Sequence, residues 1–565
     1  MSSYPKVLVV GCGPAGLAAA LTLAQNGVAV RIIEKDASPR VGQRGAGITP
    51  RSLELFEALG VLEEIQQKGR LVMPVRSYRS PGDMSDFKEF TMMPKEDPMP
   101  KYPYRNFILL GQDGLDKVMR AKLSEYGCSV DYGTELVSLE QKDDQVKVVL
   151  QVRNGICPEA ETSRVEEVYE YVIGTDGAKG VVRKQLGLQF LGDNLEIGMA
   201  IGDLKIEGLS EEYWHMWGKM EDSLFVGIRA TENPGVFNFM LGGSNFKSGK
   251  ELCQDHDLLR AFLKKHSLGD RENIKIVEVI CASSYTPTVR MVDVFGKNNV
   301  FVAGDAAHVH SPAGAQGMNT GLQDGFNIAW KMAMVCKGWA PKTLLETYNE
   351  ERFPVVAQML NITSKLMKAM ATSSGDESGW KRTGNGVNQL GVNYRWSSIV
   401  VNERSKPSFE ENKEPSKPDS YSENNFLRAG DRAPDAPGLR SLFADRNVAM
   451  TRLFTLFSPA RHTLLVFSSS PGNIRRVLDI IRQYPSEAIK AVVIAPSDAE
   501  VEMSSRSYAC DVYVDFDGHA YDAYTQTEYK AVAVVVRPDG FIGAIVETVE
   551  RLAEYFSGMF VVKNV

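Results

Sequence analysis

The sequence predicts an α/β protein in three parts: a discontinuous domain of β–α–β units, a mainly antiparallel sheet inserted into it, and a small C-terminal α/β domain. Two glycine-rich turns, at 11–16 and 304–308, each directly follow an apolar run and indicate the ends of parallel strands. Between them, residues 186–284 alternate in the way typical of antiparallel strands. Beyond residue 435, short apolar runs again alternate with helical patterns.

The first glycine-rich turn opens a β–α–β unit. The apolar run 7–10 is short enough to be a buried strand, and Gly11, Gly13 and Gly16 follow it. In a dinucleotide-binding turn, the first glycine permits the tight turn and the second lets the backbone approach the pyrophosphate. The third lets the helix pack closely on the strand. The start of that helix attracts phosphates through its free N–H groups.

An acidic residue completes this first unit. Residues 28–33 form a second apolar run, and Glu34 comes directly after it. A carboxylate at this position binds the hydroxyls of a ribose. Strand, helix, second strand and acid therefore occur in the order that a dinucleotide site requires, which favours that site over a glycine turn without a ligand.

The second glycine-rich turn indicates how long the ligand is. Gly304 and Asp305 follow the apolar run 300–303. Two turns that face phosphate and sugar, on strands so far apart in the chain, indicate one long cofactor lying across a single sheet. The cofactor that fits this pattern is FAD, so we expect a Rossmann-type FAD-binding domain in a flavin enzyme.

Composition narrows the class of protein. The 565 residues are 43% hydrophobic and 24% charged, with a net charge of −7, which is ordinary globular composition without the basic footprint of a nucleic-acid-binding protein. The seven cysteines include no CxxC pair, which favours reduced thiols. We find no run long enough to cross a bilayer, and the first strand starts too early for a secretory signal. We therefore expect a cytoplasmic protein.

Domain limits follow from these changes in pattern. The segment 401–434 is rich in Pro, Ser, Asn, Glu and Lys, which is typical of a linker. The predicted domains are an FAD-binding domain at 1–185 and 285–400, a substrate domain at 186–284 with 76–106 as a candidate contributor, and a thioredoxin-like domain at 435–565. The last domain has no CxxC, so we expect a structural or oligomerisation role for it, with a homodimer as the candidate assembly.

Longer motifs resemble a known family. They are Gly11-Cys-Gly-Pro-Ala-Gly16, Arg44-Gly-Ala-Gly-Ile, Gly174-Thr-Asp176-Gly177 and the long segment 302–319. The chain resembles the flavin-dependent aromatic hydroxylases of the p-hydroxybenzoate hydroxylase superfamily over about residues 5–370. It is more similar to the phenol hydroxylase branch, whose thioredoxin-like tail the segment after residue 428 resembles. Cys12, where Ala or Gly is common, is a departure.

The resemblance implies roles for several polar residues. Asp305 would accept hydrogen bonds from the ribityl hydroxyls of the flavin, and a helix N-cap role is compatible with this. Arg44 would pair with the pyrophosphate through its guanidinium group. Gln112 would contact the polar chain of the cofactor, and Asp176 and Gly177 would serve a similar region from another strand.

The resemblance also implies a loop along the flavin ring. The residues that match this loop are Pro312, Gly314, Gly317, Met318 and Asn319. Their backbone would lie against the isoalloxazine ring at the start of the next helix. Free N–H groups there would stabilise negative charge on reduced flavin.

The reaction implied is monooxygenation. NAD(P)H would reduce the flavin, O2 would form a flavin C4a-hydroperoxide, and one oxygen atom would pass to a phenolic ring. The protein would activate the phenol and exclude water. The sequence leaves open plain hydroxylation versus oxidative decarboxylation of a hydroxybenzoate.

Candidate substrate residues lie in and after the insert. Tyr285 and Arg290 match the Tyr…Arg spacing of the phenol hydroxylase branch, which implies a hydrogen bond from Tyr285 to the phenolic oxygen. The aromatic run 213–217 supplies three further candidates for the ring pocket: Tyr213, His215 and Trp217. Simple packing in the core is the alternative for these aromatic residues.

Other readings are open at this point. A flavin-dependent halogenase shares the domain plan, but the run starting at Trp214 lacks the WxWxIP signature. A non-catalytic escort-type protein on the same fold would not need Asp305 or the loop after it. His308 and His310 have no carboxylate or cysteine cluster nearby in sequence, so we expect no metal site.

Overall fold

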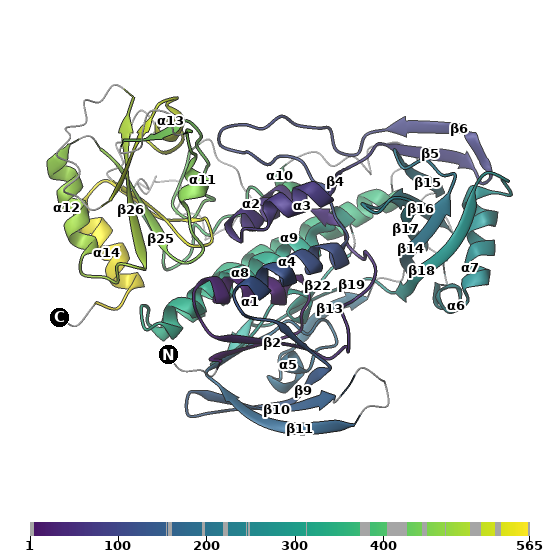
Figure 1. The fold of residues 1–565 in the computed structure, drawn as a ribbon, viewed down its shortest axis with the longest axis horizontal. Helices are drawn as coiled ribbons and strands as arrows, with labels where there is room; N and C mark the ends of the chain where they lie inside the picture. The colour runs from purple at the N-terminus through teal and green to yellow at the C-terminus, as the bar shows by residue number, and fades with distance from the viewer. Residues whose placement is uncertain are drawn as a thin grey trace.

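The fold is described from a computed structural model of the chain (Figure 1). The residues that it describes are 5–153, 155, 161–194, 198–218, 224–243, 246, 249–311, 313–372, 385–403, 426–442, 449–468, 470–497, 510–525 and 533–562. Three bodies lie side by side, with the domain predicted to bind FAD in the middle, the inserted sheet at one end and the C-terminal domain at the other (Figure 1).

A six-stranded sheet carries both glycine-rich turns. Its order is β20-β21-β12-β1-β2-β8, and every strand except β20 runs parallel to its neighbours. The strands are β1 (Val7–Val10), β2 (Val30–Glu34), β8 (Val130–Tyr132), β12 (Tyr171–Gly174), β20 (Gly296–Lys297) and β21 (Val300–Val302). Because β1, β12 and β21 are adjacent and parallel, the glycine-rich turns at 11–16 and 304–308 lie at the same end of the sheet, where these strands end.

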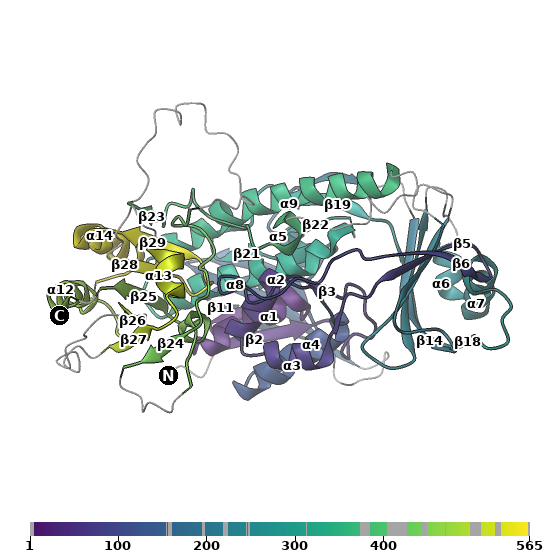
Figure 2. The same cartoon turned by 90° about the horizontal axis from the view of Figure 1, so that it is seen from above.

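Among the described residues, eight α-helices belong to the same domain as this sheet. They are α1 (Pro14–Gln25), α2 (Pro50–Ala58), α3 (Leu62–Lys68), α4 (Gln112–Glu125), α5 (Val181–Gln185), α8 (Gln316–Cys336), α9 (Thr347–Thr372) and α10 (Asn385–Asn388). The long α8 packs on α1, where a Cβ on Gly325 would lie 2.3 Å from the Ala15 carbonyl oxygen. Glycine is thus required for this close approach. Helix α9 runs alongside α8 toward the inserted sheet (Figure 2).

Three small sheets complete the FAD-binding domain. One is β9 (Thr134–Lys142), β10 (Gln145–Arg153) and β11 (Thr162–Tyr169). A second is β13 (Phe190–Asn194), β19 (Thr288–Val292) and β22 (His308–Val309). The third is β3 (Gly47–Ile48), β4 (Arg70–Leu71) and β7 (Ile108–Leu109). The second sheet joins the entry and exit of the insert to the Gly304 turn.

The inserted sheet has seven strands in the order β18-β14-β17-β16-β15-β5-β6. They are β5 (Val75–Ser80), β6 (Asp83–Phe90), β14 (Gly198–Glu207), β15 (Trp214–Gly218), β16 (Phe225–Ala230), β17 (Val236–Gly243) and β18 (Lys275–Tyr285). All pairs are antiparallel except β15 with β5. The segment 75–90 therefore belongs to this sheet, whose outer face is covered by α6 (Gly249–Gln254) and α7 (His256–Leu263).

The C-terminal domain is a second seven-stranded sheet, β23-β29-β28-β25-β26-β27-β24. Its strands are β23 (Val401–Asn402), β24 (Leu439–Ser441), β25 (His462–Phe467), β26 (Ile489–Pro496), β27 (Asp511–Asp515), β28 (Ala533–Val536) and β29 (Ile542–Val546). Its helices are α11 (Leu453–Leu456), α12 (Pro471–Ile481), α13 (His519–Tyr524) and α14 (Val549–Met559). Residues 404–425 of the expected linker lie outside the described residues, whereas β23 and Ala433, at its ends, join this domain.

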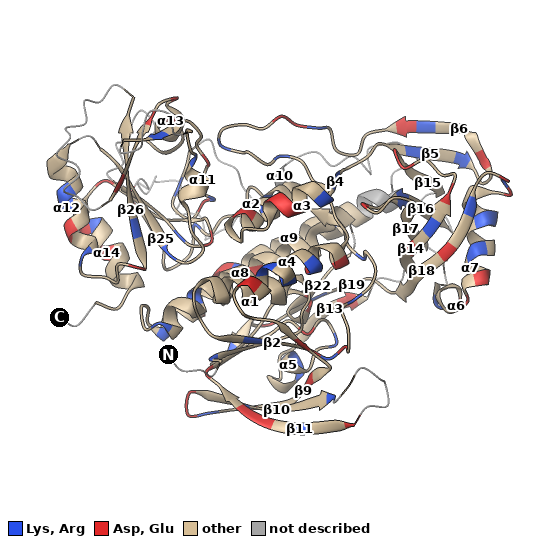
Figure 3. Cartoon of the chain, in the orientation of Figure 1, with Lys and Arg blue, Asp and Glu red and all other residues tan. Residues whose placement is uncertain are grey.

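Charge is spread over the surface with both signs mixed. Both acidic and basic residues occur on β6 and on α7, at the outer end of the inserted sheet (Figure 3). Across the described part of the chain, no helix is both long and apolar enough to cross a membrane.

Candidate functional site

The first glycine-rich turn has the geometry of a ligand cradle. Gly11 has a φ of 103°, and its N–H donates to the Ile33 carbonyl at 2.8 Å. A Cβ on Gly16 would lie 2.1 Å from the Gly11 carbonyl oxygen, so this position needs glycine for the fold itself. Around Gly13, by contrast, no atom of the described residues lies within 4 Å of a Cβ position. The open space beside Gly13 fits a ligand that approaches the backbone.

Glu34 turns back toward this cradle from the end of β2. One carboxylate oxygen accepts from the Cys12 N–H at 3.0 Å, and the other accepts from the Asp36 N–H at 3.2 Å. The carboxylate is thereby held beside the glycine turn, where ribose hydroxyls are expected.

Asp305 lies within the electrostatic influence of several basic side chains. Its side chain is exposed, yet desolvation by the surrounding protein raises the pKa of its carboxyl group, while His308, Arg40 and Arg44 act in the opposite direction. Arg44 lies across from it with a positive φ of 45°. Desolvation and the nearby Arg40 lower the pKa of the Arg44 guanidinium, and Asp305 counteracts them. An exposed carboxylate close to two arginines is suited to a cofactor with phosphates and hydroxyls.

Gln112 and Asp176, two further predicted contacts of the cofactor, each have partners within the protein. The Gln112 side-chain oxygen accepts from Arg40 at 3.3 Å, at the first residue of α4. Asp176 accepts from the Val181 and Val182 N–H groups at 2.5 and 3.0 Å, so one of its oxygens caps α5. Its other carboxylate oxygen is buried without a partner among the described residues. Gly177, directly after it, has a φ of 77°.

The start of α8 follows a short segment of left-handed backbone. Gly314 and Ala315 have φ values of 82° and 55°, and no side chain caps the helix at Ala315. Gly317 is tightly packed, since a Cβ there would lie 2.1 Å from His310 Nε2. Met318 follows in the same uncapped turn. Pro312, predicted for this loop, lies outside the described residues.

Asn319 holds the loop through its side chain. Its amide nitrogen donates to the Gly47 and Ala315 carbonyls at 2.8 and 2.6 Å, and its oxygen accepts from the Thr49 N–H at 3.0 Å. The side chain is therefore fully used by the protein. Any contact of Asn319 with the cofactor would come from its backbone.

A buried ion cluster behind the second turn was missed by the sequence-based prediction. Asp324 accepts from the Gly304 N–H at 3.1 Å, from His308 Nε2 at 2.6 Å and from Arg352 Nε at 2.7 Å. Burial opposes ionisation of Asp324, but Arg352 and His308 hold the pKa of its carboxyl group below the ordinary value. The sequence offers one indication of this cluster, because Asp324 and Arg352 are charged residues within otherwise largely apolar helices.

A methionine-rich cluster lies where the loop before α8 contacts the inserted sheet. It consists of Val75, Met92, Met199, Met216, Phe225, Ala313 and Met367. Tyr285 and Trp214 are partly buried against it. Burial raises the pKa of the Tyr285 hydroxyl to about 12. Because Ala313 belongs to the α8 loop, Tyr285 lies on the face of the sheet that looks toward the expected flavin ring.

The three aromatic candidates of the insert lie on the other face. Trp217 packs in the core formed with α7, His215 binds the Tyr78 hydroxyl at 2.7 Å, and Tyr213 stacks against Arg76 at 3.4 Å. Successive strand residues point to opposite faces. These contacts favour simple packing in the core for the three residues, whose part in substrate binding stays a prediction. Their neighbours Trp214 and Met216 face the methionine-rich cluster.

Arg290 lies in the small sheet formed by β13, β19 and β22. It lies on β19, and its guanidinium donates to the Asn194 side-chain oxygen at 3.0 Å. Its charge also acts on Arg183 of α5. The structure thus brings Tyr285 to the cluster but leaves Arg290 beside the FAD-binding domain. Across the described residues, no group of three or more His, Cys, Asp or Glu side chains is placed to hold a metal ion.

Comparison with known proteins places this site in a family. Residues 4–363 match the family described as FAD binding domain, and residues 485–564 match the phenol hydroxylase C-terminal dimerisation domain. A flavin-dependent monooxygenase of Mycobacteroides abscessus is 30% identical over 98% of this chain and 99% of its own length. The chain belongs to the family of FAD-binding, flavin-dependent monooxygenases.

Other relatives of this monooxygenase match over nearly the full chain or over the FAD-binding region. Pentachlorophenol 4-monooxygenase of Sphingobium chlorophenolicum is 29% identical over 96% of both chains. Rifampicin monooxygenase of Streptomyces venezuelae is 29% identical over 66% of this chain and 73% of its own. The resemblance to aromatic hydroxylases with a phenol hydroxylase-type C-terminal region is confirmed.

Solved structures share the fold of the whole monooxygenase. The flavin-dependent monooxygenase PieE, in complex with FAD and substrate, has a TM-score of 0.78 at 19% identity, covering 98% of this chain and 99% of that one. Aklavinone-11 hydroxylase, in a ternary complex with FAD and aklavinone, has a TM-score of 0.76 at 21% identity and the same coverage. At such identities the likeness shows the fold alone.

Proposed function

We propose that this monooxygenase uses NAD(P)H and O2 to hydroxylate a phenolic aromatic substrate, in a single chain that also holds FAD. The observation that carries the proposal is the uncapped start of α8, which lies next to Ala313 of the methionine-rich cluster. This arrangement sets a positive helix terminus beside an apolar region bordered by Tyr285. Bound FAD would supply the reduction and activation of O2.

The protein's own groups would prepare the reaction. The start of α8, which no side chain caps at Ala315, would favour negative charge on a reduced ring through the helix dipole. Because the pKa of Tyr285 is raised to about 12, its hydroxyl stays protonated at neutral pH and can donate to a phenolic oxygen. Trp214, Met216 and their apolar neighbours exclude water from the reacting atoms.

The relatives' names support an aromatic substrate. They include enzymes named for pentachlorophenol, rifampicin and 6-methylpretetramide. For this chain we propose a phenolic ring, with plain hydroxylation and oxidative decarboxylation as the two outcomes to be distinguished.

For the C-terminal domain we propose a thioredoxin-like fold and a part in homodimer formation. The order β26-β25-β28-β29, with β25 parallel to β26 and antiparallel to β28, supports the fold. The match to a dimerisation domain supports the assembly. Light scattering on the purified protein would show twice the mass of the chain if this is correct.

The test of the proposed activity is substrate-dependent oxidation of NADH and of NADPH by the purified protein. A panel of phenols and hydroxybenzoates is supplied, and product masses are measured. A gain of one oxygen, with or without loss of CO2, is expected for at least one phenol. Reduced nicotinamide consumed only to hydrogen peroxide with every compound would contradict the proposal.

A further inference from the structure

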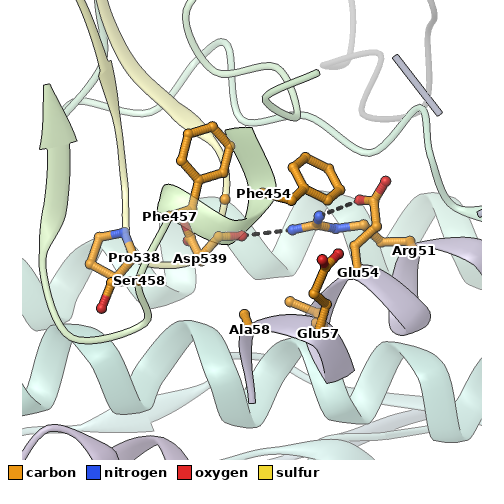
Figure 4. Close-up of a pocket in the computed structure, with 11 residues that line it drawn as sticks. Arg51, Glu54, Glu57, Ala58, Phe454, Phe457, Ser458, Pro538 and Asp539 are labelled. Atoms are coloured by element: carbon orange, nitrogen blue, oxygen red, sulfur yellow. Dashed lines mark hydrogen bonds and ion pairs between the residues drawn. The ribbon is translucent and has the colours of Figure 1, made fainter. Parts of the chain in front are cut away.

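A fully buried arginine of the C-terminal domain, Arg537, contacts the FAD-binding domain. Arg537 forms two bonds with Glu351 of α9, at 2.7 and 2.9 Å, and two with Asp539, at 2.5 and 3.1 Å. All three side chains are at most 4% exposed. Figure 4 shows Asp539 at this junction, where its carbonyl accepts from Arg51 of α2 at 2.6 Å. The contact is therefore an ionic one between domains, sealed from water.

Helix α8 joins the same cluster. Lys331 donates to Glu351 at 2.7 Å, and Trp330 donates to Asp539 at 3.0 Å. Asn327 reaches both carboxylates, at 2.8 and 3.3 Å. The two long helices of the FAD-binding domain and the loop after β28 thus share one set of buried charges.

Arg352, the next residue of α9, extends these buried contacts toward the second glycine-rich turn. Arg352 donates to Asp324, and Asp324 in turn accepts from the N–H of Gly304, directly before Asp305. Tyr394 lies close to both Arg352 and Arg537. Its hydroxyl accepts from Arg352 at 2.9 Å, and the Arg537 guanidinium lies 5.4 Å from its ring centroid.

We propose that Arg537 is a positioning residue for the flavin turn, acting through Glu351, Arg352 and Asp324 on the backbone of Gly304–Asp305. By this inference the C-terminal domain is part of the flavin site's support, a role beyond dimerisation. A buried charge that loses its partner is strongly unfavourable. Disturbing Arg537 therefore forces α9 to move, and the Arg352–Asp324 pair moves with it.

The test measures FAD affinity and does not depend on turnover. Arg537→Lys keeps the charge but cannot satisfy both carboxylates with four bonds. We expect it to weaken FAD binding about tenfold, equivalent to about 1.4 kcal/mol. The matched control is Arg432→Lys, because Arg432 is buried at the same junction but pairs with Glu54 of α2 at 2.8 Å. The control should change the FAD dissociation constant less than about twofold.

A double-mutant cycle then distinguishes positioning from general destabilisation. Tyr394→Phe removes one hydroxyl from the link, and its effect on FAD binding should be non-additive with that of Arg537→Lys. The melting temperatures of the apoproteins are measured in parallel. Equal losses of FAD affinity and of stability in Arg537→Lys and Arg432→Lys would overturn the inference. If Arg537→Lys does not fold, unchanged FAD affinity in Tyr394→Phe would do the same.

Discussion

Glu351 and Arg352 are adjacent on α9, yet they pair in opposite directions. Glu351 accepts from Arg537 at 2.7 Å, and Arg352 donates to Asp324 at 2.7 Å, all four side chains being fully buried. Adjacent helical residues point about 100° apart, so one turn of helix can serve two neighbours. Burial opposes ionisation of Glu351, but Arg537 and Lys331 hold the pKa of its carboxyl group well below the ordinary value. Helix α9 therefore links two domains by charge.

Gly13→Ala should separate cofactor binding from folding. The Gly13 backbone (φ −69°, ψ 176°) suits alanine, and no atom of the described residues lies within 4 Å of the new Cβ. The apoprotein should keep its melting temperature, while FAD binding, measured by flavin fluorescence, weakens at least about tenfold because the methyl group occupies the ligand's space.

Gly16→Ala is the matched control for this change. Its Cβ would lie 2.1 Å from the Gly11 carbonyl oxygen, so the apoprotein itself should lose stability. Wild-type FAD affinity in Gly13→Ala would show that the phosphates lie elsewhere.

The glycine turns could be predicted from the sequence because their requirement is local. A strand ending in a tight turn needs glycine at fixed offsets, and β1 begins and ends where the apolar run predicts. Helix α8 begins at Gln316, on glycine-rich backbone without a capping side chain. Its start depends on the Asn319 bonds to distant Gly47 and Thr49, which no local pattern reveals.

The two sides of β15 should differ in function. Met216→Ala removes an apolar contact on the face toward Tyr285, so KM for the aromatic substrate should rise several-fold through lost burial of about 1 kcal/mol. Trp217→Phe, on the opposite face, should lower the melting temperature and leave KM unchanged. Steady-state kinetics on both variants check this. A larger rise in KM for Trp217→Phe than for Met216→Ala would indicate that the substrate binds on the face of the sheet that packs against α7.

This difference also marks a limit of sequence-based prediction. The alternation in 213–217 defines two faces but not which face meets the flavin, and a shift of one residue exchanges them. The face is decided by β15 pairing with β5, which comes from residues 75–80, far earlier in the chain. The buried pair of Asp324 and Arg352 has the same origin, because it exists only once α8 and α9 are packed together.

Stability should fall as the solution becomes acidic, partly through His215. Burial lowers the pKa of its imidazole from 6.5 to about 4, and the ring is held neutral between the Tyr78 hydroxyl and the Ser210 carbonyl. Between these two pH values the unfolded chain binds a proton that the folded one does not. The free energy of unfolding should therefore decrease by up to about 1.4 kcal/mol per pH unit for this group.

Chemical denaturation of the wild type and of His215→Gln checks the sign. The wild type should lose more stability than the variant between about pH 6.5 and about pH 4, since glutamine has no proton to gain. Parallel pH dependence in the two proteins would contradict a neutral His215.

Tyr285→Phe should slow hydroxylation while leaving the flavin content unchanged. The hydroxyl borders the methionine-rich cluster, and its raised pKa of about 12 keeps it a hydrogen-bond donor throughout the neutral range. Loss of a hydrogen bond to a phenolate-like oxygen costs about 1.5 to 3 kcal/mol, so kcat/KM should fall roughly ten- to hundredfold. Single-turnover product formation and the visible flavin spectrum separate the two effects. Wild-type product formation in the variant would remove Tyr285 from the reaction.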